Sequence, residues 1–256
     1  MSSAAAAGQF LTAINQDGST NSAADGSDWK LTGNSGTTPG TNFIGTIDNS
    51  SLVIKVFNGT ALRIVPDVLL ESPTIIGGSP ANSATAGVRG GTIAGGGNPN
   101  PDWDNQVTDN FCTVGGGSGN KAGNGSGTTT DTTHATIGGG LINRATGGFS
   151  TVAGGFNNQA SGSHSTIPGG ESNRATGARS FAAGLRANAL HDGAFVWSDA
   201  TTGTTFDSTA ANEFSVKATG GVRFFSAVDY STGVTLAAGG GAWQTVSDRN
   251  TKRDFR

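Results

Sequence analysis

The sequence has few of the residues from which sites for metals, nucleic acids or membranes are usually built. Its one cysteine, Cys112, excludes an intrachain disulfide framework and a metal cluster built on cysteine. Charged residues make up 13% of the chain and the net charge is −3, so the composition shows no electrostatic footprint for nucleic acid. No apolar run reaches the roughly 18 residues of a membrane-spanning helix. Helical patterns of apolar residues are also hard to find, which predicts an all-β protein.

The first residues lack the features of a secretory signal. Residues 1–8 have no basic segment and no leucine-rich run after it. We interpret this as favouring a virion part, assembled inside a cell, over a secreted adhesin. The expected location is therefore a virion tail fibre, or else the extracellular space or cell surface.

Glycine is abundant, and its placement is periodic. The sequence contains 43 glycines. Between residues 136 and 188 the sequence repeats every 15 residues, and each 15-residue repeat is called a line below. A fixed period with fixed chemistry at each position is typical of repeat architectures. The aligned columns hold Thr136, Thr151, Thr166 and Phe181; Ile137, Val152, Ile167 and Ala182; Gly139, Gly154, Gly169 and Gly184; Asn143, Asn158, Asn173 and Asn188; and Ala145, Ala160 and Ala175.

One line is long enough for two short strands and two turns. The Gly-Gly and Asn-to-Gly segments predict turns, because glycine and asparagine tolerate positive φ. Successive lines then stack as parallel strands about 4.8 Å apart, with the Ile/Val and Ala columns inward. Stacked asparagines and threonines can form hydrogen-bonded ladders. The sequence thus predicts an all-β parallel roll, or solenoid, of about 15-residue repeats, flanked by hairpin-rich segments.

The predicted coil is thin. Each line buries one β-branched residue and one alanine, against a backbone entropy cost of about 1–2 kcal/mol per residue. Association of several chains is the natural remedy. We therefore expect a homotrimeric fibre.

Lines 151–165 and 166–180 resemble the head repeats of YadA-type trimeric adhesins. The resemblance extends over about residues 90–190. It implies a left-handed parallel β-roll, three chains wide, that binds host or matrix surfaces. Pro168 and the length of the line depart from the family pattern.

The rest of the chain is interpreted as segments around this repeat. Asn58 and Gly59, between the apolar runs 52–56 and 62–65, predict a hairpin. The unit containing them resembles strand-rich segments of phage tail fibres, and its Trp29 is a core or trimer-contact residue or, less simply, a sugar platform. The predicted segments are a linker at 1–27, this hairpin unit at 28–66, degenerate repeats with surface insertions at 67–135, regular repeats at 136–190, a cap and β neck at 191–238, and a truncated chaperone start at 239–256.

Within the degenerate repeats, Thr92 and Thr113 restate the start of a line, and insertions between lines are expected on the outer surface. The insertion around Trp103, with Asp102 and Asp104 on either side, is a candidate ligand contact, because a ring with flanking acceptors suits a sugar. The alternative is an ordinary loop that places Trp103 on the roll.

A second candidate ligand surface is the polar stripe of Arg144, Gln159 and Arg174. Such a stripe could hold acidic glycans, or it could be an ordinary solvated face. The histidines at 134, 164 and 191 are assigned to different columns, so no metal site and no cofactor is predicted.

Residues 213–218 and 222–225 predict a second hairpin in the neck, with Phe214 facing a three-fold axis. The segment from 239 onward resembles the start of an endosialidase-type intramolecular chaperone. That resemblance implies a self-cleavage dyad of Ser247 and Lys252. Its chemistry needs a lysine held neutral by burial. We expect the dyad to be inert in this chain, since the chaperone body does not follow it here.

Three functions compete. The first is a structural and surface-recognition fibre, like a tail fibre, whose partners are an upstream fibre or baseplate component and a cell-surface glycan or protein receptor. The second is a tailspike-type enzyme that degrades polysaccharide with Asp102, Asp104 and Asp109 across a subunit boundary. The third is a surface adhesin or purely mechanical filament. We predict the first, and no enzyme activity.

Overall fold

The computed structural model describes residues 9–14, 20–24, 35–38, 41, 43–69, 71–100, 102–201 and 203–247. They form strands, turns and loops, and none of them belongs to a helix that could cross a membrane. The chain divides into two units, Met1–Ile47 and Asp48–Arg256. In the first, β1 (Gln9–Ile14) pairs antiparallel with β2 (Thr20–Ala24). Trp29 lies outside the described residues.

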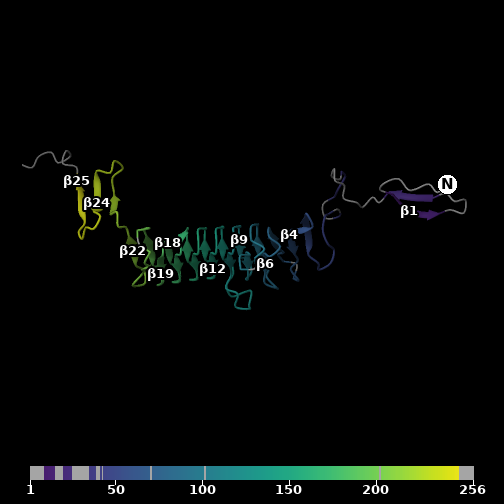
Figure 1. Cartoon of the computed structure of the whole chain (residues 1–256), viewed down its shortest axis with the longest axis horizontal. Coiled ribbons are helices and arrows are strands. Elements are labelled where there is room, and N and C mark those ends of the chain that lie inside the picture. The colour runs from purple at the N-terminus through teal and green to yellow at the C-terminus, as the bar shows by residue number, and fades with distance from the viewer. Residues whose placement is uncertain are drawn as a thin grey trace, which may run out of the picture. The chain divides into compact units, whose positions relative to one another are not determined.

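A parallel β-solenoid occupies most of the second unit, as the stacked arrows of Figure 1 show. Each rung gives one short strand to each of two sheets. The first sheet contains β5 (Thr74–Gly77), β7 (Thr92–Ile93), β9 (Thr113–Val114), β11 (Thr136–Ile137), β13 (Thr151–Val152), β15 (Thr166–Ile167), β18 (Phe181–Leu185), β20 (Phe195–Ser198) and β22 (Phe214–Lys217), with β16 (Gly170–Glu171) beside β18. The second contains β6 (Ser83–Ala84), β8 (Gln106–Val107), β10 (Lys121–Ala122), β12 (Arg144–Ala145), β14 (Gln159–Ala160), β17 (Arg174–Ala175), β19 (Ala187–Ala189) and β21 (Phe206–Asp207).

The core of the solenoid consists of the two inward columns that the periodicity predicts. Ile137, Val152 and Ile167 from one sheet have no exposed surface, and neither do Ala145 and Ala160 from the other. The small alanine lets the second sheet approach the first closely. The all-β class and the solenoid of roughly 15-residue rungs are thereby confirmed, as are the line starts at Thr92 and Thr113, which pair in register.

An unbroken ladder of asparagine side chains runs through the turns between the sheets. In the middle of the ladder, Asn158 Oδ1 accepts the backbone N–H of Asn173 at 3.0 Å, while its Nδ2 donates to the carbonyls of Gly154 and Gly170 at 3.0 Å each. Every buried amide therefore serves its own rung and the next one, which satisfies turn groups that have no strand partner. The backbone N–H donors held in this way belong to Asn105, Asn120, Asn143, Asn158, Asn173 and Ala187.

The register shifts by one residue between Phe181, which still pairs with Thr166, and Gly184, and this shift corrects two predicted columns. Gly184 pairs with Gly170 instead of aligning with Gly169. Asn188 pairs with Arg174, so it lies outside the asparagine ladder, and Ala187 takes the ladder position. A rung one residue shorter keeps both sheets continuous because the strand pairing resumes at once in β18 and β19.

The solenoid also continues past the point where the periodicity fades. Phe181, Phe195 and Phe214 replace the threonine column, and their rings stack at centroid distances of 4.6 and 4.8 Å. The predicted hairpin between 213–218 and 222–225 is wrong, because β22 pairs with β20 in the solenoid. β23 (Val222–Phe225) instead joins β24 (Thr232–Leu236) and β25 (Gln244–Ser247) in an antiparallel sheet. The segment boundaries stay predictions.

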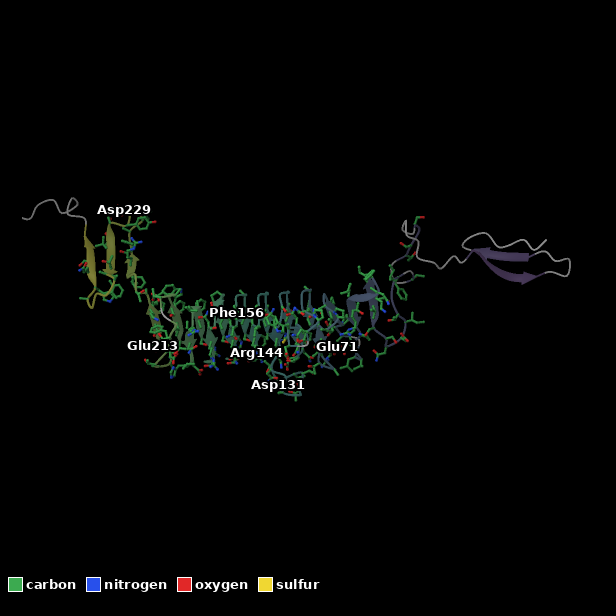
Figure 2. All side chains as sticks on the ribbon, in the orientation of Figure 1. Glu71, Asp131, Arg144, Phe156, Glu213 and Asp229 are labelled. Atoms are coloured by element: carbon green, nitrogen blue, oxygen red, sulfur yellow. The ribbon has the colours of Figure 1, made fainter. Side chains whose placement is uncertain are left out.

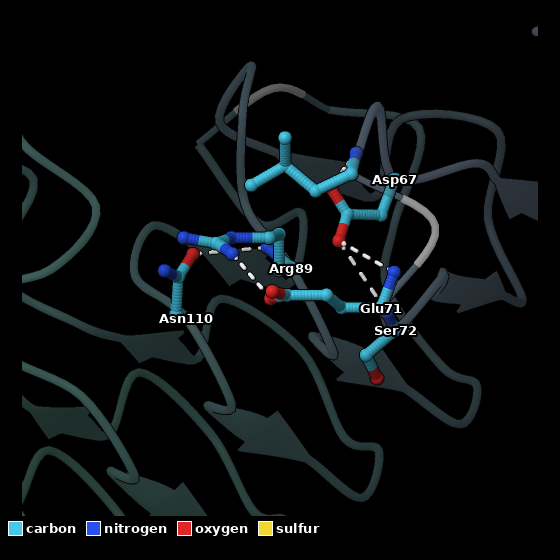
Figure 3. Close-up of polar contacts among 6 residues, drawn as sticks. Asp67, Glu71, Ser72, Arg89 and Asn110 are labelled. Atoms are coloured by element: carbon cyan, nitrogen blue, oxygen red, sulfur yellow. Dashed lines mark hydrogen bonds and ion pairs between the residues drawn. The ribbon is translucent and has the colours of Figure 1, made fainter.

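The other predicted hairpin is confirmed at the opposite end of the solenoid. β3 (Leu52–Val56) pairs antiparallel with β4 (Gly59–Val65), and β4 continues onto β5. Its turn residues are Phe57 and Asn58, both at positive φ, one position earlier than Asn-Gly suggests. Polar contacts fasten the next loop to the first rungs (Figure 3): Arg89 forms an ion pair with Glu71, and its backbone N–H donates to Asn110 Oδ1 at 2.9 Å.

Candidate functional site

The outer surface of the second sheet carries one continuous column of polar side chains. Because side chains alternate along a strand, the residue before each buried alanine points outward. Lys121, Arg144, Gln159 and Arg174 occupy this position on four successive rungs and pair in register. Arg144 and Arg174 are exposed, while Lys121 and Gln159 are half-buried. We call these four residues the cationic stripe; Figure 2 labels Arg144 within it.

Arg144 and Arg174 line a common hollow of about 280 Å³. Asn158 also lines it, but its amide nitrogen already donates to two glycine carbonyls. The other polar side chains of this hollow are those of Asn157, Gln159 and Ser172. Two guanidinium groups, two amides and a hydroxyl therefore face one volume, and together they can donate several hydrogen bonds to a carboxylate or sulfate. The predicted stripe is confirmed as a column, and its role in binding stays a prediction.

A second hollow, of about 190 Å³, lies next to the first and shares Arg144 with it. Asp102, Asp104 and Lys121 also line it, so the structure brings two of the predicted acidic residues to the predicted stripe. Asp104 is largely buried and accepts hydrogen bonds from Gln106 Nε2 at 3.1 and 3.2 Å. The sequence interpretation missed Lys121, although Asn120-Lys-Ala122 aligns with Asn143-Arg-Ala145 and could have extended the stripe.

Trp103 lies beside these hollows without lining either of them. Its side chain is 38% exposed. Its backbone is held to the next rung, because its carbonyl accepts from Ser118 Oγ at 2.8 Å and from the N–H of Gly119 at 2.9 Å. The insertion is therefore fixed at the edge of the second hollow, and ligand contact by Trp103 stays a prediction.

The side chain of Asp109 lies in a different environment from those of Asp102 and Asp104. It is fully buried, and its Oδ2 accepts from Thr108 Oγ1 and from the N–H of Asn124, both at 2.9 Å. Burial raises the pKa of its carboxyl group. Within one chain, the three aspartates named for a tailspike-type enzyme do not meet in a single hollow.

A column of stacked rings crosses the outer turns on another side of the rungs. Phe111, His134, Phe149 and His164 stack at centroid distances of 5.1, 4.8 and 4.9 Å. The assignment of His134 and His164 to different columns is therefore wrong: both lie 15 residues from Phe149, and the three rings share one column. Stacking covers the ring faces and leaves mainly ring edges exposed to solvent. A sugar packs on an open ring face, so this column is a poor sugar-binding surface.

The remaining candidates for chemistry are limited. Burial raises the pKa of the Cys112 thiol to about 11, which keeps it protonated and unreactive at neutral pH. Within the described ranges, no three His, Cys, Asp or Glu side chains gather as for a metal ion. Lys252 of the predicted dyad lies outside the described residues, and Ser247 is described only as the last residue of β25. Self-cleavage stays a prediction.

A family model of known proteins matches part of the chain. Residues 150–162 match the family model of the ubiquitous surface protein adhesin repeat. No curated protein matches the chain. The matched segment covers β13 and β14 with the turn between them, one rung of the solenoid. The match and the β-solenoid together fit an adhesin-like repeat protein of the cell surface or extracellular space, and adhesin repeats of this kind are typically trimeric.

Proposed function

We propose that this protein is a structural and surface-recognition fibre that binds an acidic cell-surface glycan along its cationic stripe. The observation that supports the proposal is the alignment of Lys121, Arg144 and Arg174 on one side of a repetitive scaffold. Strand stacking sets consecutive rungs about 4.8 Å apart, so Arg144 and Arg174, two rungs apart, lie roughly 10 Å from each other. A linear polymer with recurring carboxylates or sulfates can therefore meet several cations at once.

The rigid scaffold keeps the loss of conformational entropy on ligand binding small. Backbone pairing fixes each stripe residue on both sides, and the ladder fixes the turn before it. The backbone therefore loses little freedom when a ligand binds. Each single contact with an exposed guanidinium is weak, and affinity arises when many contacts act together on one polymer.

We further propose that the working form is a homotrimer. The solenoid core holds only Val152 and Ala160, or their equivalents, per rung. Large apolar side chains remain outside it: Phe149, Phe156 and Phe214 are 52%, 42% and 63% exposed. Packing three chains together would bury such groups and triple the number of stripes. Sedimentation equilibrium should give three times the chain mass; a folded monomer at nanomolar concentration would contradict this proposal.

The tail-fibre assignment is a proposal of the same kind. It is supported by the resemblance of the segment around Ser247 to the start of a self-releasing chaperone. The experiment is to express the full-length gene product and measure its mass before and after Ser247→Ala substitution. Loss of a C-terminal fragment only in the wild type would support the tail-fibre class, and an uncleaved product in both would favour a bacterial surface fibre.

Glycan binding is tested by immobilising acidic and neutral polysaccharides and measuring binding of the intact protein. We expect binding to the acidic polymers that weakens as ionic strength rises. Arg144→Gln combined with Arg174→Gln should weaken it at least tenfold, which corresponds to about 1.4 kcal/mol. The matched control is Arg179→Gln, because Arg179 is exposed and cationic but lies outside the stripe. Equal losses in both variants would refute the assigned surface.

A further inference from the structure

The insertion at 123–131 folds into a loop whose side chains present mainly oxygen atoms. Asn124, Ser126 and Thr128 alternate with glycines that have φ values of 100°, 66° and 100° at positions 123, 125 and 127. Asp131 Oδ2 accepts from Asn124 Nδ2 at 3.0 Å and from Ser126 Oγ at 2.8 Å. Positive φ at every second residue turns the alternate side chains toward Asp131. Figure 2 shows Asp131 on this loop, which projects from the solenoid.

Beneath the loop lies a carboxylate oxygen that has no donor. Asp109 has no exposed surface, and while its Oδ2 is satisfied by Thr108 and Asn124, its Oδ1 is buried without a hydrogen-bond partner among the described residues. A buried, unpaired charged oxygen is costly, and native structures rarely keep one. The carboxyl groups of Asp109 and Asp131 face each other, close enough for a proton on Asp109 to be shared with Asp131 when no ion lies between them.

The two acidic groups have no cationic side chain between them. The nearby cation is Lys121, whose ammonium group lies next to Gly125. Neither Lys121 nor any other described side chain forms an ion pair within 4.0 Å with Asp109 or Asp131. Two adjacent carboxyl groups cannot both remain ionised without a compensating charge. The loop and the rung beneath it therefore combine two carboxyl groups, several neutral oxygens and one buried oxygen without a hydrogen-bond partner.

We propose that Asp109 and Asp131, together with the side-chain oxygens of Asn124, Ser126 and Thr128, bind a Ca²⁺ ion. Calcium takes oxygen ligands from carboxylates, amides and hydroxyls in flexible geometry, whereas Mg²⁺ requires a near-ideal octahedron. The ion gives Asp109 Oδ1 a partner and balances both carboxylates. Rotation of the Asn124 amide presents its oxygen to the ion and exchanges the hydrogen bond that this oxygen now accepts from the N–H of Ser126 at 2.8 Å for an ion contact. The ion thereby fastens the inserted loop to the rung that carries Asp109.

The test uses the full chain, freed of metal with EDTA and titrated with CaCl₂ by calorimetry, with thermal unfolding measured in parallel. We expect one ion per chain with a dissociation constant of about 0.1–1 mM, the range of extracellular calcium modules. The melting temperature should rise with CaCl₂ and saturate over the same range. Titration with MgCl₂ should give at least tenfold weaker binding.

Substitutions locate the ion. Asp131→Asn and Asp109→Asn should each weaken Ca²⁺ binding at least tenfold. The matched control is Asp229→Asn, because Asp229 is also an exposed loop aspartate that accepts from a nearby serine, Ser231. If Asp109→Asn does not fold, Asp131→Asn suffices, since Asp131 lies on an exposed loop.

Several outcomes would overturn the proposal. One is the absence of saturable binding up to about 10 mM CaCl₂, well above the expected range. Another is unchanged affinity in Asp131→Asn, and a third is equal affinity for Mg²⁺. Stabilisation of the loop by acid with no response to CaCl₂ would show that the two carboxyl groups share a proton instead of an ion.

Discussion

Asn158 connects three successive rungs, and its removal should be among the most destabilising single changes in the solenoid. Truncation to alanine leaves the buried N–H of Asn173 without its acceptor, since no other contact of that N–H is present in the described structure. An unsatisfied buried donor costs about 1–3 kcal/mol. The carbonyls of Gly154 and Gly170 each lose a donor at 3.0 Å, worth about 0.5–1.5 kcal/mol apiece. The expected loss is about 4 kcal/mol, against a typical total stability of about 5–15 kcal/mol.

Asn158→Asp tests the loss of the amide donor while the acceptor oxygen is kept. The aspartate keeps an oxygen for the N–H of Asn173 but places a second oxygen against the two glycine carbonyls. Burial and repulsion would then raise its folded-state pKa above the unfolded value of about 3.9. At pH 7 this variant should be at least as unstable as Asn158→Ala. Its penalty should shrink as the pH falls through the raised pKa, because the protonated carboxyl can donate to a carbonyl.

The assay is urea unfolding followed by circular dichroism at one fixed protein concentration, because chain association would make stability depend on concentration. Asn157→Gly is the matched control. Asn157 is the preceding residue, is exposed and has a φ of 55°, and its side chain donates one surface hydrogen bond, to Ser172 Oγ at 3.2 Å. If Asn158→Ala lowers the free energy of unfolding by no more than about 1 kcal/mol beyond this control, the hydrogen bonds of the ladder do not stabilise the fold.

Two further predictions concern the turns. Gly155→Ala should cost more than about 2 kcal/mol, because φ is +91° there and the added Cβ would lie 2.2 Å from the carbonyl oxygen of Gly170. Gly154→Ala, whose nearest neighbour is 4.0 Å away, should be nearly neutral in the same urea assay; equal losses would contradict the steric argument. Near β22, a hydrogen bond from Ser215 and two backbone N–H groups lower the pKa of Glu213 to about 2. The stabilisation by Glu213 is full above the ordinary glutamate pKa of 4.5 and is lost as the pH falls toward 2. The melting temperature of Glu213→Gln should therefore fall less steeply with acid than that of wild type, and parallel curves would count against this role.

The repeat could be predicted because its period and its core chemistry are local. Thr136, Ile137 and Asn143 recur at fixed offsets, and each column demands the same environment on every rung. Strand pairing, inward columns and the asparagine ladder follow from that identity. The hairpin at Asn58 was equally local, since its strands are separated by a single turn.

The predictions failed where the period changed. Asn188 matches the column residue in type, but one residue is missing from its rung, and strand continuity decides the alignment over residue identity. Phe195 and Phe214 continue the solenoid by stacking on Phe181, although they share no residue type with the threonines before them. Phe111 stacks on His134 across an insertion whose length a fixed period cannot absorb. His134 and His164 keep the period, and their common column could have been predicted from spacing alone.

The candidate surfaces divide in the same way. Arg144 and Arg174 could be placed on one stripe from spacing alone, because they occupy the same position in rungs of equal length. The meeting of Arg144 with Asp102 and Asp104, and of Asp109 with Asp131, depends on how insertions of different lengths fold back onto the rungs. Local periodicity determines which side chains share a column. Only the folded chain brings together residues that no fixed interval connects, because loop closure is set by packing and hydrogen bonding in space and leaves no constant spacing in the sequence.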